Sequence, residues 1–291
     1  MHRKLNILKS LILVFVACCM LALSGCSAIV SSALSGVVDD LSTTILNSND
    51  LEMVEAGAPA YLLMIDSFVK EDSDNAEMLM SAALLYTAYA DTFVSDKQRA
   101  RKLADKAFDY ASRALCSKNA NGCSLNHIDY EKFKTVISKM DHDDIPLLFT
   151  LGSSWASWIK ANSNDFNAVA DISRIEIIME RVVELDETYK DGSALLYLGM
   201  LATLLPPALG GQPEKGRQYF EKAIKISQGK NLMIKVVLAK QYARLIFDRK
   251  LHDKLLKDVL KEDPDAPGYT LINTYAQKKA KELLESADEY F

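Results

Sequence analysis

Apolar residues recur three and four positions apart over nearly the whole chain, and this spacing constrains the fold more than any other feature. The period places apolar side chains on one face of an α-helix. No stretch of five or more residues alternates cleanly between apolar and polar side chains, as a half-buried strand would require. The chain is therefore predicted to be all-α. The expected helical stretches are residues 27–50, 61–69, 78–94, 100–115, 127–140, 145–161, 166–185, 194–205, 214–226, 232–247, 251–260 and 271–290.

Turn-forming residues are scarce, with 12 Gly and 7 Pro in 291 residues, which argues against an all-β chain built on tight turns. Apolar residues make up 49% of the chain and supply enough material for a buried core. The net charge is −5, so no excess of basic residues is available to neutralise a nucleic-acid backbone. We therefore expect no nucleic-acid partner.

The first 25 residues have the pattern of a bacterial lipoprotein signal peptide. Basic residues near the start precede an apolar run over residues 11–23, and this run is shorter than the roughly 20 residues of a membrane-spanning helix. Ser24 and Gly25 stand directly before Cys26, and these small residues resemble the lipobox, where lipoproteins are cleaved and acylated. We predict lipid attachment, palmitate included, at Cys26, which would anchor a periplasmic chain to a bacterial membrane. The alternative is an ordinary secretion signal with a cysteine nearby.

Cys116 and Cys123 are the two cysteines that remain beyond Cys26. Six residues rich in turn formers separate them, so they are candidates for a disulfide in an oxidising periplasm. Two free thiols are the alternative. A zinc site is not expected, because no other Cys or His pair stands at ligand spacing.

The helical stretches come in pairs with the spacing of tetratricopeptide repeats. In such repeats, a Leu-Gly-x-x-aromatic motif in the first helix precedes small and large residues, four and three positions apart, in the second. Residues 151–155 carry the motif, and Ile175, Met179 and Val182 follow at that spacing. A small residue in the first helix lets the second approach closely. Further pairs lie within residues 198–223 and 238–259, and a weaker pair lies within residues 85–111.

These patterns predict three segments. Residues 1–25 are the signal peptide, residues 26–50 the lipidated tether and first helix, and residues 51–291 the repeat domain. Inserted loop residues break the regular 34-residue period of the repeat, so we expect degenerate tetratricopeptide-like hairpins in one superhelical domain. Such superhelices present a concave face, which is usually the binding face.

Four side chains are candidates for a ligand path or a partner contact: Trp155, Trp158, Tyr242 and Arg244. The two tryptophans lie three positions apart on one helical face, and the alternative is that this face is simply core. Arg244 stands in a basic and acidic stretch near Asp248, where local pairing at a helix end is the simpler interpretation.

Other polar clusters have simpler explanations than catalysis or metal binding. Residues 141–144 read Asp-His-Asp-Asp directly before Ile-Pro, where acidic residues favour a helix start over a metal site. Ser153 and Ser154 lack a nucleophile motif such as Gly-x-Ser-x-Gly. We therefore expect no catalytic residues, metal or cofactor, with a hydrolase of lipids or wall fragments as the competing hypothesis.

Longer stretches resemble one known family. Residues 204–216 read LLPPALGGQPEKG and residues 242–256 read YARLIFDRKLHDKLL. Near the front, residues 58–63 (APAYLL) and 84–90 (LLYTAYA) also fit, and the chain closes with SADEYF. The chain resembles the T-component (TatT) lipoproteins of periplasmic TRAP transporter systems over its whole mature length.

The resemblance implies a non-enzymatic helical lipoprotein that assembles as a homotrimer. It also implies binding of a cognate periplasmic solute-binding protein and delivery of a hydrophobic or organic-acid ligand. The alternative is a tetratricopeptide-like lipoprotein scaffold of outer-membrane assembly or secretion machinery.

Overall fold

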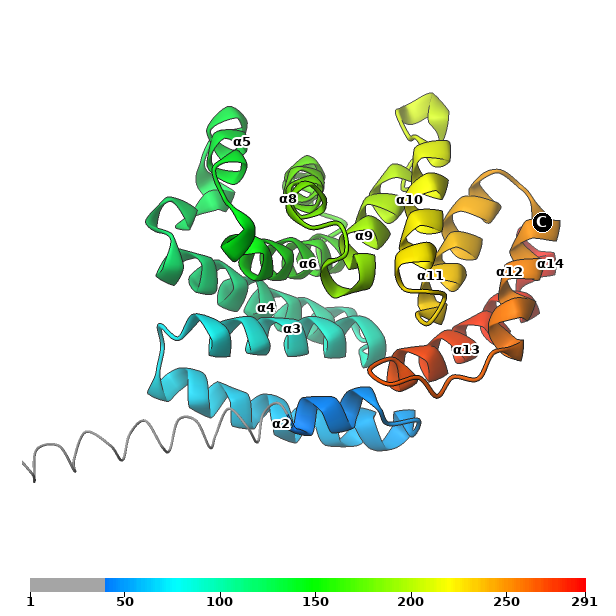
Figure 1. Cartoon of the computed structure of the whole chain (residues 1–291), viewed down its shortest axis with the longest axis horizontal. Helices are drawn as coiled ribbons and strands as arrows, with labels where there is room; N and C mark the ends of the chain where they lie inside the picture. Colours follow the sequence, from blue (N-terminus) through cyan, green and yellow to red (C-terminus); the bar gives the residue numbers. More distant parts are fainter. Residues whose placement is uncertain (1–39) are drawn as a thin grey trace, which may run out of the picture.

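Helices form the regular structure of residues 40–291, the part of the chain that the computed structural model describes (Figure 1). No strand occurs in that range, so the prediction of an all-α fold is confirmed for it. The predicted signal peptide and Cys26 lie outside the described residues. Within residues 40–291, no helix combines the length and the apolarity that a membrane span requires.

A short helical stretch at residues 40–46 precedes the named helices. A π-helical segment, η6 (Leu238–Ala243), directly continues α11. The α-helices are α2 (Leu51–Glu71), α3 (Ala76–Phe93), α4 (Lys97–Lys118), α5 (Tyr130–Ser138), α6 (Ile145–Ala161), α7 (Phe166–Ala170), α8 (Ile172–Leu185), α9 (Ser193–Ala202), α10 (Pro213–Ile226), α11 (Leu232–Val237), α12 (Arg249–Lys261), α13 (Thr270–Glu285) and α14 (Ala287–Tyr290).

Aspartate side chains define where several of these helices begin. Asp50 Oδ1 accepts a hydrogen bond from the backbone N–H of Met53 at 2.8 Å, and Asp96 Oδ1 accepts one from Arg99 at 2.7 Å. Such caps satisfy backbone donors that the first turn leaves unpaired. The Asp50 cap starts α2 well before the predicted position 61, and Pro59 lies inside the helix without ending it.

Residues 271–290, predicted as one helix, form α13 and α14 on either side of Ser286. Two further stretches that were predicted as single helices are divided. Residues 166–185 form α7 and α8, which meet at Asp171, whose carboxylate pairs with Arg174 at 3.1 Å. Residues 232–247 begin as α11 and continue as the π-helical η6. The apolar period alone did not reveal either change, because it is similar on both sides of each junction.

Helices that follow one another in sequence pack on one another, and the end of the chain returns to its beginning. α3 packs on α2 and α4, α6 on α4 and α8, α9 on α8 and α10, and α12 on α13. α13 then contacts α2, as Figure 1 shows at the lower right. Here the Gly268 N–H donates to Asn47 Oδ1 at 2.7 Å, and the rings of Phe93 and Tyr275 lie 6.5 Å apart. The superhelical tetratricopeptide-like arrangement stays a prediction.

Two glycines allow helices to pack unusually closely. A Cβ atom at Gly152 in α6 would lie 2.7 Å from Met179 Cε in α8, and one at Gly199 in α9 would lie 2.7 Å from Phe220 Cε1 in α10. The missing side chains therefore set the separation of α6 from α8 and of α9 from α10.

The apolar core consists of one large cluster and two small ones. The large cluster spans α2 to α9 and holds Trp155 and Phe133, both fully buried. One small cluster joins α11, η6, α12 and α13, and the other joins α9, α10, α11 and η6. The large cluster and the small ones meet around α9.

A disulfide links Cys116, in the last turn of α4, to Cys123, with a Cα–Cα distance of 4.4 Å. Cys123 directly follows a short 3₁₀ turn, η1 (Ala120–Gly122). The bond therefore fixes the first loop after α4.

Candidate ligand-binding site

An apolar pocket of about 540 Å³ lies where α6, α7, α8, α9 and η6 meet. Its volume is in the range of roughly 300–1,000 Å³ that small-molecule sites occupy. Apolar side chains form most of its wall: Ala156, Ile159, Val169, Ile172, Ile175, Met200, Leu201 and Leu204. Its polar lining residues are Asp91, Ser157, Lys160, Ser163, Tyr197 and Gln241.

Two of these polar side chains have hydrogen-bonding atoms that no described residue satisfies. The Tyr197 ring packs edge-on against Phe149 at 6.0 Å, while its hydroxyl has no partner within residues 40–291. Burial, and to a lesser extent the negative charge of Asp91, raises the pKa of Tyr197, so its hydroxyl stays protonated and can donate. Gln241 Oε1 accepts from Thr203 Oγ1 at 2.9 Å, which leaves the Nε2 donors free of described partners.

Cationic side chains gather at the edge of the pocket. Lys160 Nζ lies 2.8 Å from Asp91 Oδ1. Lys240, in η6, is exposed and has no ion-pair partner among the described residues. Desolvation lowers the pKa of Lys240, and so do the positive charges of Lys160, Lys279 and Arg244. Lys240 therefore lies within electrostatic reach of three other cations.

A second, more polar pocket of about 210 Å³ adjoins the first, between the ends of α3 and α6 and the start of α4. It brings two more cations, Lys97 and Arg101, neither of which has an ion-pair partner within residues 40–291. The residues that line both pockets are Asp91, Ser157, Lys160 and Ser163. The two pockets therefore share one border, at the C-terminal end of α6.

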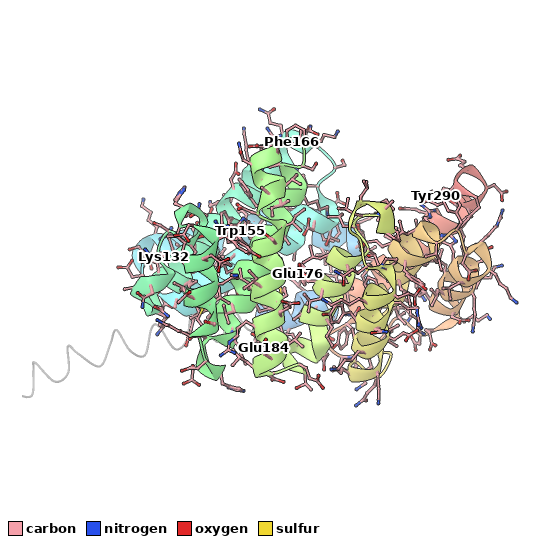
Figure 2. The ribbon with its side chains drawn as sticks, turned by 90° about the horizontal axis from the view of Figure 1, so that it is seen from above. Lys132, Trp155, Phe166, Glu176, Glu184 and Tyr290 are labelled. Carbon is pink, nitrogen blue, oxygen red and sulfur yellow. A yellow bond between two sulfur atoms is a disulfide. The ribbon has the colours of Figure 1, made fainter. Side chains whose placement is uncertain are left out.

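The predicted tryptophans lie on another face of α6. Trp155 is fully buried between Phe108, at 5.0 Å, and Phe133, at 6.0 Å. Trp158 Nε1 donates to Asp105 in α4 at 2.7 Å. Neither tryptophan lines the apolar pocket. Figure 2 shows Trp155 among the helices, whereas Phe166 and Glu184 mark the two ends of the α7–α8 pair. A contact of either tryptophan with a ligand or partner stays a prediction.

Trp155 Nε1 is itself a buried donor without a hydrogen-bond acceptor. Its N–H lies close enough to Asp171 to influence that carboxyl group. Burial raises the pKa of Asp171, and the Arg174 guanidinium and the Trp155 N–H oppose this rise. The indole ring therefore contributes apolar packing, and its N–H interacts with the Asp171 carboxyl group without forming a hydrogen bond to it.

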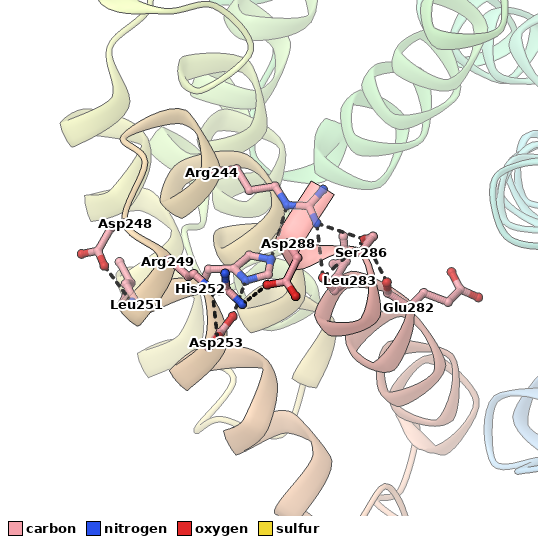
Figure 3. Close-up of polar contacts among 10 residues, drawn as sticks. All are labelled: Arg244, Asp248, Arg249, Leu251, His252, Asp253, Glu282, Leu283, Ser286 and Asp288. Atoms are coloured by element: carbon pink, nitrogen blue, oxygen red, sulfur yellow. Dashed lines mark hydrogen bonds and ion pairs between the residues drawn. The ribbon is translucent and has the colours of Figure 1, made fainter. Parts of the chain in front are cut away.

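Tyr242 and Arg244, the other predicted candidates, bind elements away from the pocket. The Tyr242 hydroxyl donates to Glu214 at the start of α10; burial and this hydrogen bond raise the pKa of Tyr242 to about 12. Arg244 donates from Nε to His252 Nε2 at 3.3 Å and from its terminal nitrogen to the Leu283 carbonyl at 3.3 Å (Figure 3). Both side chains thus tie η6 to neighbouring helices. Their contact with a partner also stays a prediction.

The acidic and basic residues around Arg244 pair locally, though not all with Asp248. Asp248 caps α12 by accepting from the Leu251 N–H at 2.8 Å. Arg249 reaches Asp288 in α14, as Figure 3 shows. His252 is fully buried, and its Nδ1 lies 2.9 Å from Asp253 Oδ1. The cluster therefore fastens α12 to the C-terminal helices.

The Asp-His-Asp-Asp cluster lies at a helix start, as predicted, but it caps the 3₁₀ turn His142–Asp144 that directly precedes α6. The Asp141 side chain accepts from the Asp143 N–H at 3.0 Å, and Asp144 Oδ2 accepts from the Asp141 N–H at 3.1 Å. In the described part of the chain, no group of three or more His, Cys, Asp or Glu side chains is placed to hold a metal ion.

Sequence reasoning did not single out Lys160, Tyr197, Lys240 or Gln241. Two of them carry a signal in the sequence. Lys160 is the one charged residue of α6, and Tyr197 is the one aromatic residue of α9, in which Ser193 is the other polar residue. A lysine in a mostly apolar helix marks a position where the helix face meets something other than core.

The fold and the pocket together define the class: an all-α protein with an apolar, ligand-sized pocket and a cationic border. The sequence model of the TRAP transporter T-component family matches residues 47–291, so the chain belongs to that family. No curated protein matches the sequence.

Family membership gives the chain a role in TRAP transport, in association with a TRAP transport system. A periplasmic or membrane-associated location goes with that role. The family is a transporter component and not an enzyme family.

Proposed function

We propose that the chain is a lipid-anchored periplasmic adaptor of a TRAP-type transport system, which binds a cognate solute-binding protein and assists uptake of a small hydrophobic or organic-acid ligand. The observation that carries this proposal is the apolar pocket with unsatisfied polar donors and a cationic border. Preformed apolar pockets with a few polar groups are the usual form of small-molecule sites.

Exposed apolar side chains, one of which lines the pocket, offer a surface for the solute-binding protein. Phe166, at the start of α7, is 90% exposed, and Leu209, in the loop between α9 and α10, is 66% exposed. Leu204, in the same loop, both lines the pocket and is half exposed. Exposed apolar patches of this kind mark interaction sites. A partner docked here would sit next to the pocket, which suits the transfer of a ligand.

The anchor and the assembly complete the proposal. Cleavage after residue 25 and acylation of Cys26 would tether the chain to the membrane, with residues 26–50 as the tether and first helix. Residues 51–291 would then act as one tetratricopeptide-like domain within a homotrimer, as in the family. A Cys26→Ser variant should leave the membrane fraction, and retained membrane partitioning would remove the lipid anchor from the proposal.

The proposed adaptor is not an enzyme. Ser153 and Ser154 are buried, and their hydroxyls bond Thr150 and Thr87 within the protein. The His252 ring is engaged by Asp253 and Arg244. None of these serines has a histidine base within hydrogen-bonding distance, as nucleophilic catalysis needs. Alanine replacement of both serines should leave every transport phenotype unchanged if the protein still folds.

Partner capture tests the adaptor role. The tagged full-length chain is recovered from the membranes of its own host, and its bound proteins are identified. The captured partner is then purified and titrated against the chain by calorimetry. We expect a soluble solute-binding protein at near-equal stoichiometry, with binding weakened at least tenfold by Phe166→Ser combined with Leu209→Ser. The exposed control substitution Tyr130→Ser, on α5, should not weaken it. Recovery of outer-membrane assembly or secretion components instead would favour the scaffold alternative.

A further inference from the structure

The apolar and polar pockets adjoin, so that a single ligand molecule could occupy both. They share four lining residues: Asp91, Ser157, Lys160 and Ser163. Lys160 stands at this border, with the uncharged, mostly apolar wall from α8 and α9 on one side and the start of α4 on the other. A ligand that spans the border therefore needs one polar end and one apolar end.

The positive charge at the border of the two pockets favours an anionic ligand group. Three cations, Lys97, Arg101 and Lys160, line the polar pocket, whereas Asp91 is its one lining carboxylate. Of these cations, only Lys160 has an ion-pair partner in residues 40–291. This local excess occurs in a chain whose net charge is −5, so it is not the average character of the protein.

The donors without described partners indicate which polar group the ligand carries. The Tyr197 hydroxyl and Gln241 Nε2 can donate hydrogen bonds, and Lys160 adds a charged donor. A carboxylate accepts from several donors at once, whereas an uncharged apolar ligand that covered the Tyr197 hydroxyl and Gln241 Nε2 would leave both without a hydrogen-bond partner. A short dicarboxylate would satisfy the donors but leave most of the apolar pocket, whose volume is about 540 Å³, unfilled.

We propose that the two pockets form one site for an amphipathic monocarboxylate, with an unbranched apolar tail between α6, α8 and α9 and its carboxylate beside Lys160. In the unliganded site Asp91 neutralises Lys160, and the incoming carboxylate takes over that pairing. The inference deepens the proposed function by naming the ligand class of its pocket.

The test titrates the full chain alone with three probes below their aggregation concentrations: decanoate, decanol and acetate. Decanoate should bind, decanol should bind at least tenfold more weakly because it lacks the charge, and acetate should not bind measurably. Along a series from hexanoate to decanoate, affinity should rise by about fourfold per methylene. Equal affinity for decanoate and decanol would overturn the charged head, and acetate binding as well as decanoate would overturn the tail site.

Variants at the border give the sharper result. Lys160→Gln should weaken decanoate binding about tenfold or more and leave decanol unchanged. Asp91→Asn should strengthen decanoate binding, because it removes the competing carboxylate. Lys132→Gln, an exposed lysine on α5 away from the pocket (Figure 2), is the matched control and should change neither.

Two further variants distinguish the site of the apolar tail from the site of the carboxylate. Ala156→Phe should weaken decanoate and decanol alike, whereas Tyr197→Phe should weaken decanoate alone. Circular dichroism and the melting temperature confirm that each variant is folded. If folded Lys160→Gln and Ala156→Phe both bind decanoate like the unaltered chain, the proposed site is wrong. These titrations contain no partner, so their failure leaves the capture of a solute-binding protein as a separate result.

Discussion

The two ends of this molecule differ in the size of their apolar core. From α2 to α9, buried apolar side chains form one continuous cluster around Trp155. From α10 to α14, the apolar clusters are small, and polar side chains link separate elements. Asn273, for example, binds the Leu232 N–H at 3.0 Å and the carbonyls of Lys230 and Pro264 at 2.9 and 3.2 Å.

This difference bears on the location of the pocket. The pocket lies where the large cluster ends, with α6, α8 and α9 on one side and η6 on the other. Apolar packing makes the first wall rigid because every lost contact leaves a void. The second wall depends on a few directional bonds and includes a π-helical turn, a feature often found at functional sites. We expect the C-terminal wall to open more readily than the N-terminal one.

The largest effect should come from Trp155→Ala, which removes the largest fully buried side chain of the N-terminal region. The free energy of unfolding should fall by about 3–5 kcal/mol, as for other buried aromatic truncations. Urea denaturation measures it. Trp155→Phe is the control, since it keeps a ring and removes the unpaired N–H, and it should cost much less. A loss under about 1 kcal/mol for the alanine variant would mean that the large cluster is not what holds this region together.

Asn273→Ala tests the C-terminal region in the same way. It leaves one buried N–H and two carbonyls without their partner, so we expect a loss of about 2–3 kcal/mol. Hydrogen exchange should accelerate in α11, α12 and α13, while the amides of α3, α4 and α6 stay protected. The adjacent Thr274→Ala, whose hydroxyl bonds only within its own helix, should have little effect. Uniform acceleration over the whole chain would contradict the division into two regions.

The smallest effect concerns alkaline pH. The pKa of Tyr242 is raised in the folded chain to about 12, above its ordinary value of about 10. Its contribution to stability is therefore complete below about pH 10 and is lost as the pH rises towards 12. Tyr242→Phe should cost about 1 kcal/mol at neutral pH and make the fall between pH 10 and 12 shallower. Tyr130→Phe, an exposed tyrosine on α5, should leave the pH profile unchanged.

Helix boundaries were predictable where local chemistry defines them. Residues 145–161 were predicted as a helix and form α6, which has Pro146 in its first turn and directly follows the 3₁₀ turn that Asp141 caps. Residues 232–247 were also predicted as one helix, but an extra residue per turn in η6 changes the direction of the side chains that follow. The direction in which Tyr242 and Gln241 point therefore could not be derived from an α-helical period.

The site was the less predictable part. Trp155 and Trp158 were correctly placed on a common helical face, since both rings pack on Phe108. The pocket, however, lies against a different face of α6, which Ala156, Ile159 and Lys160 form. Tryptophan is a common choice of candidate binding residue because its side chain is large, but here the Trp155 side chain fills the apolar core.

By itself, the sequence determined the all-α fold, the position of most helices and the resemblance to the T-component family. These depend on local periodicity, on caps and on short recognisable stretches. Only the tertiary structure decided that Asp91, Lys160, Tyr197 and Gln241, from four separate segments, meet at one pocket. The physical reason is that a helical period states which residues share a face, but not which neighbouring helix, or which empty space, that face will meet.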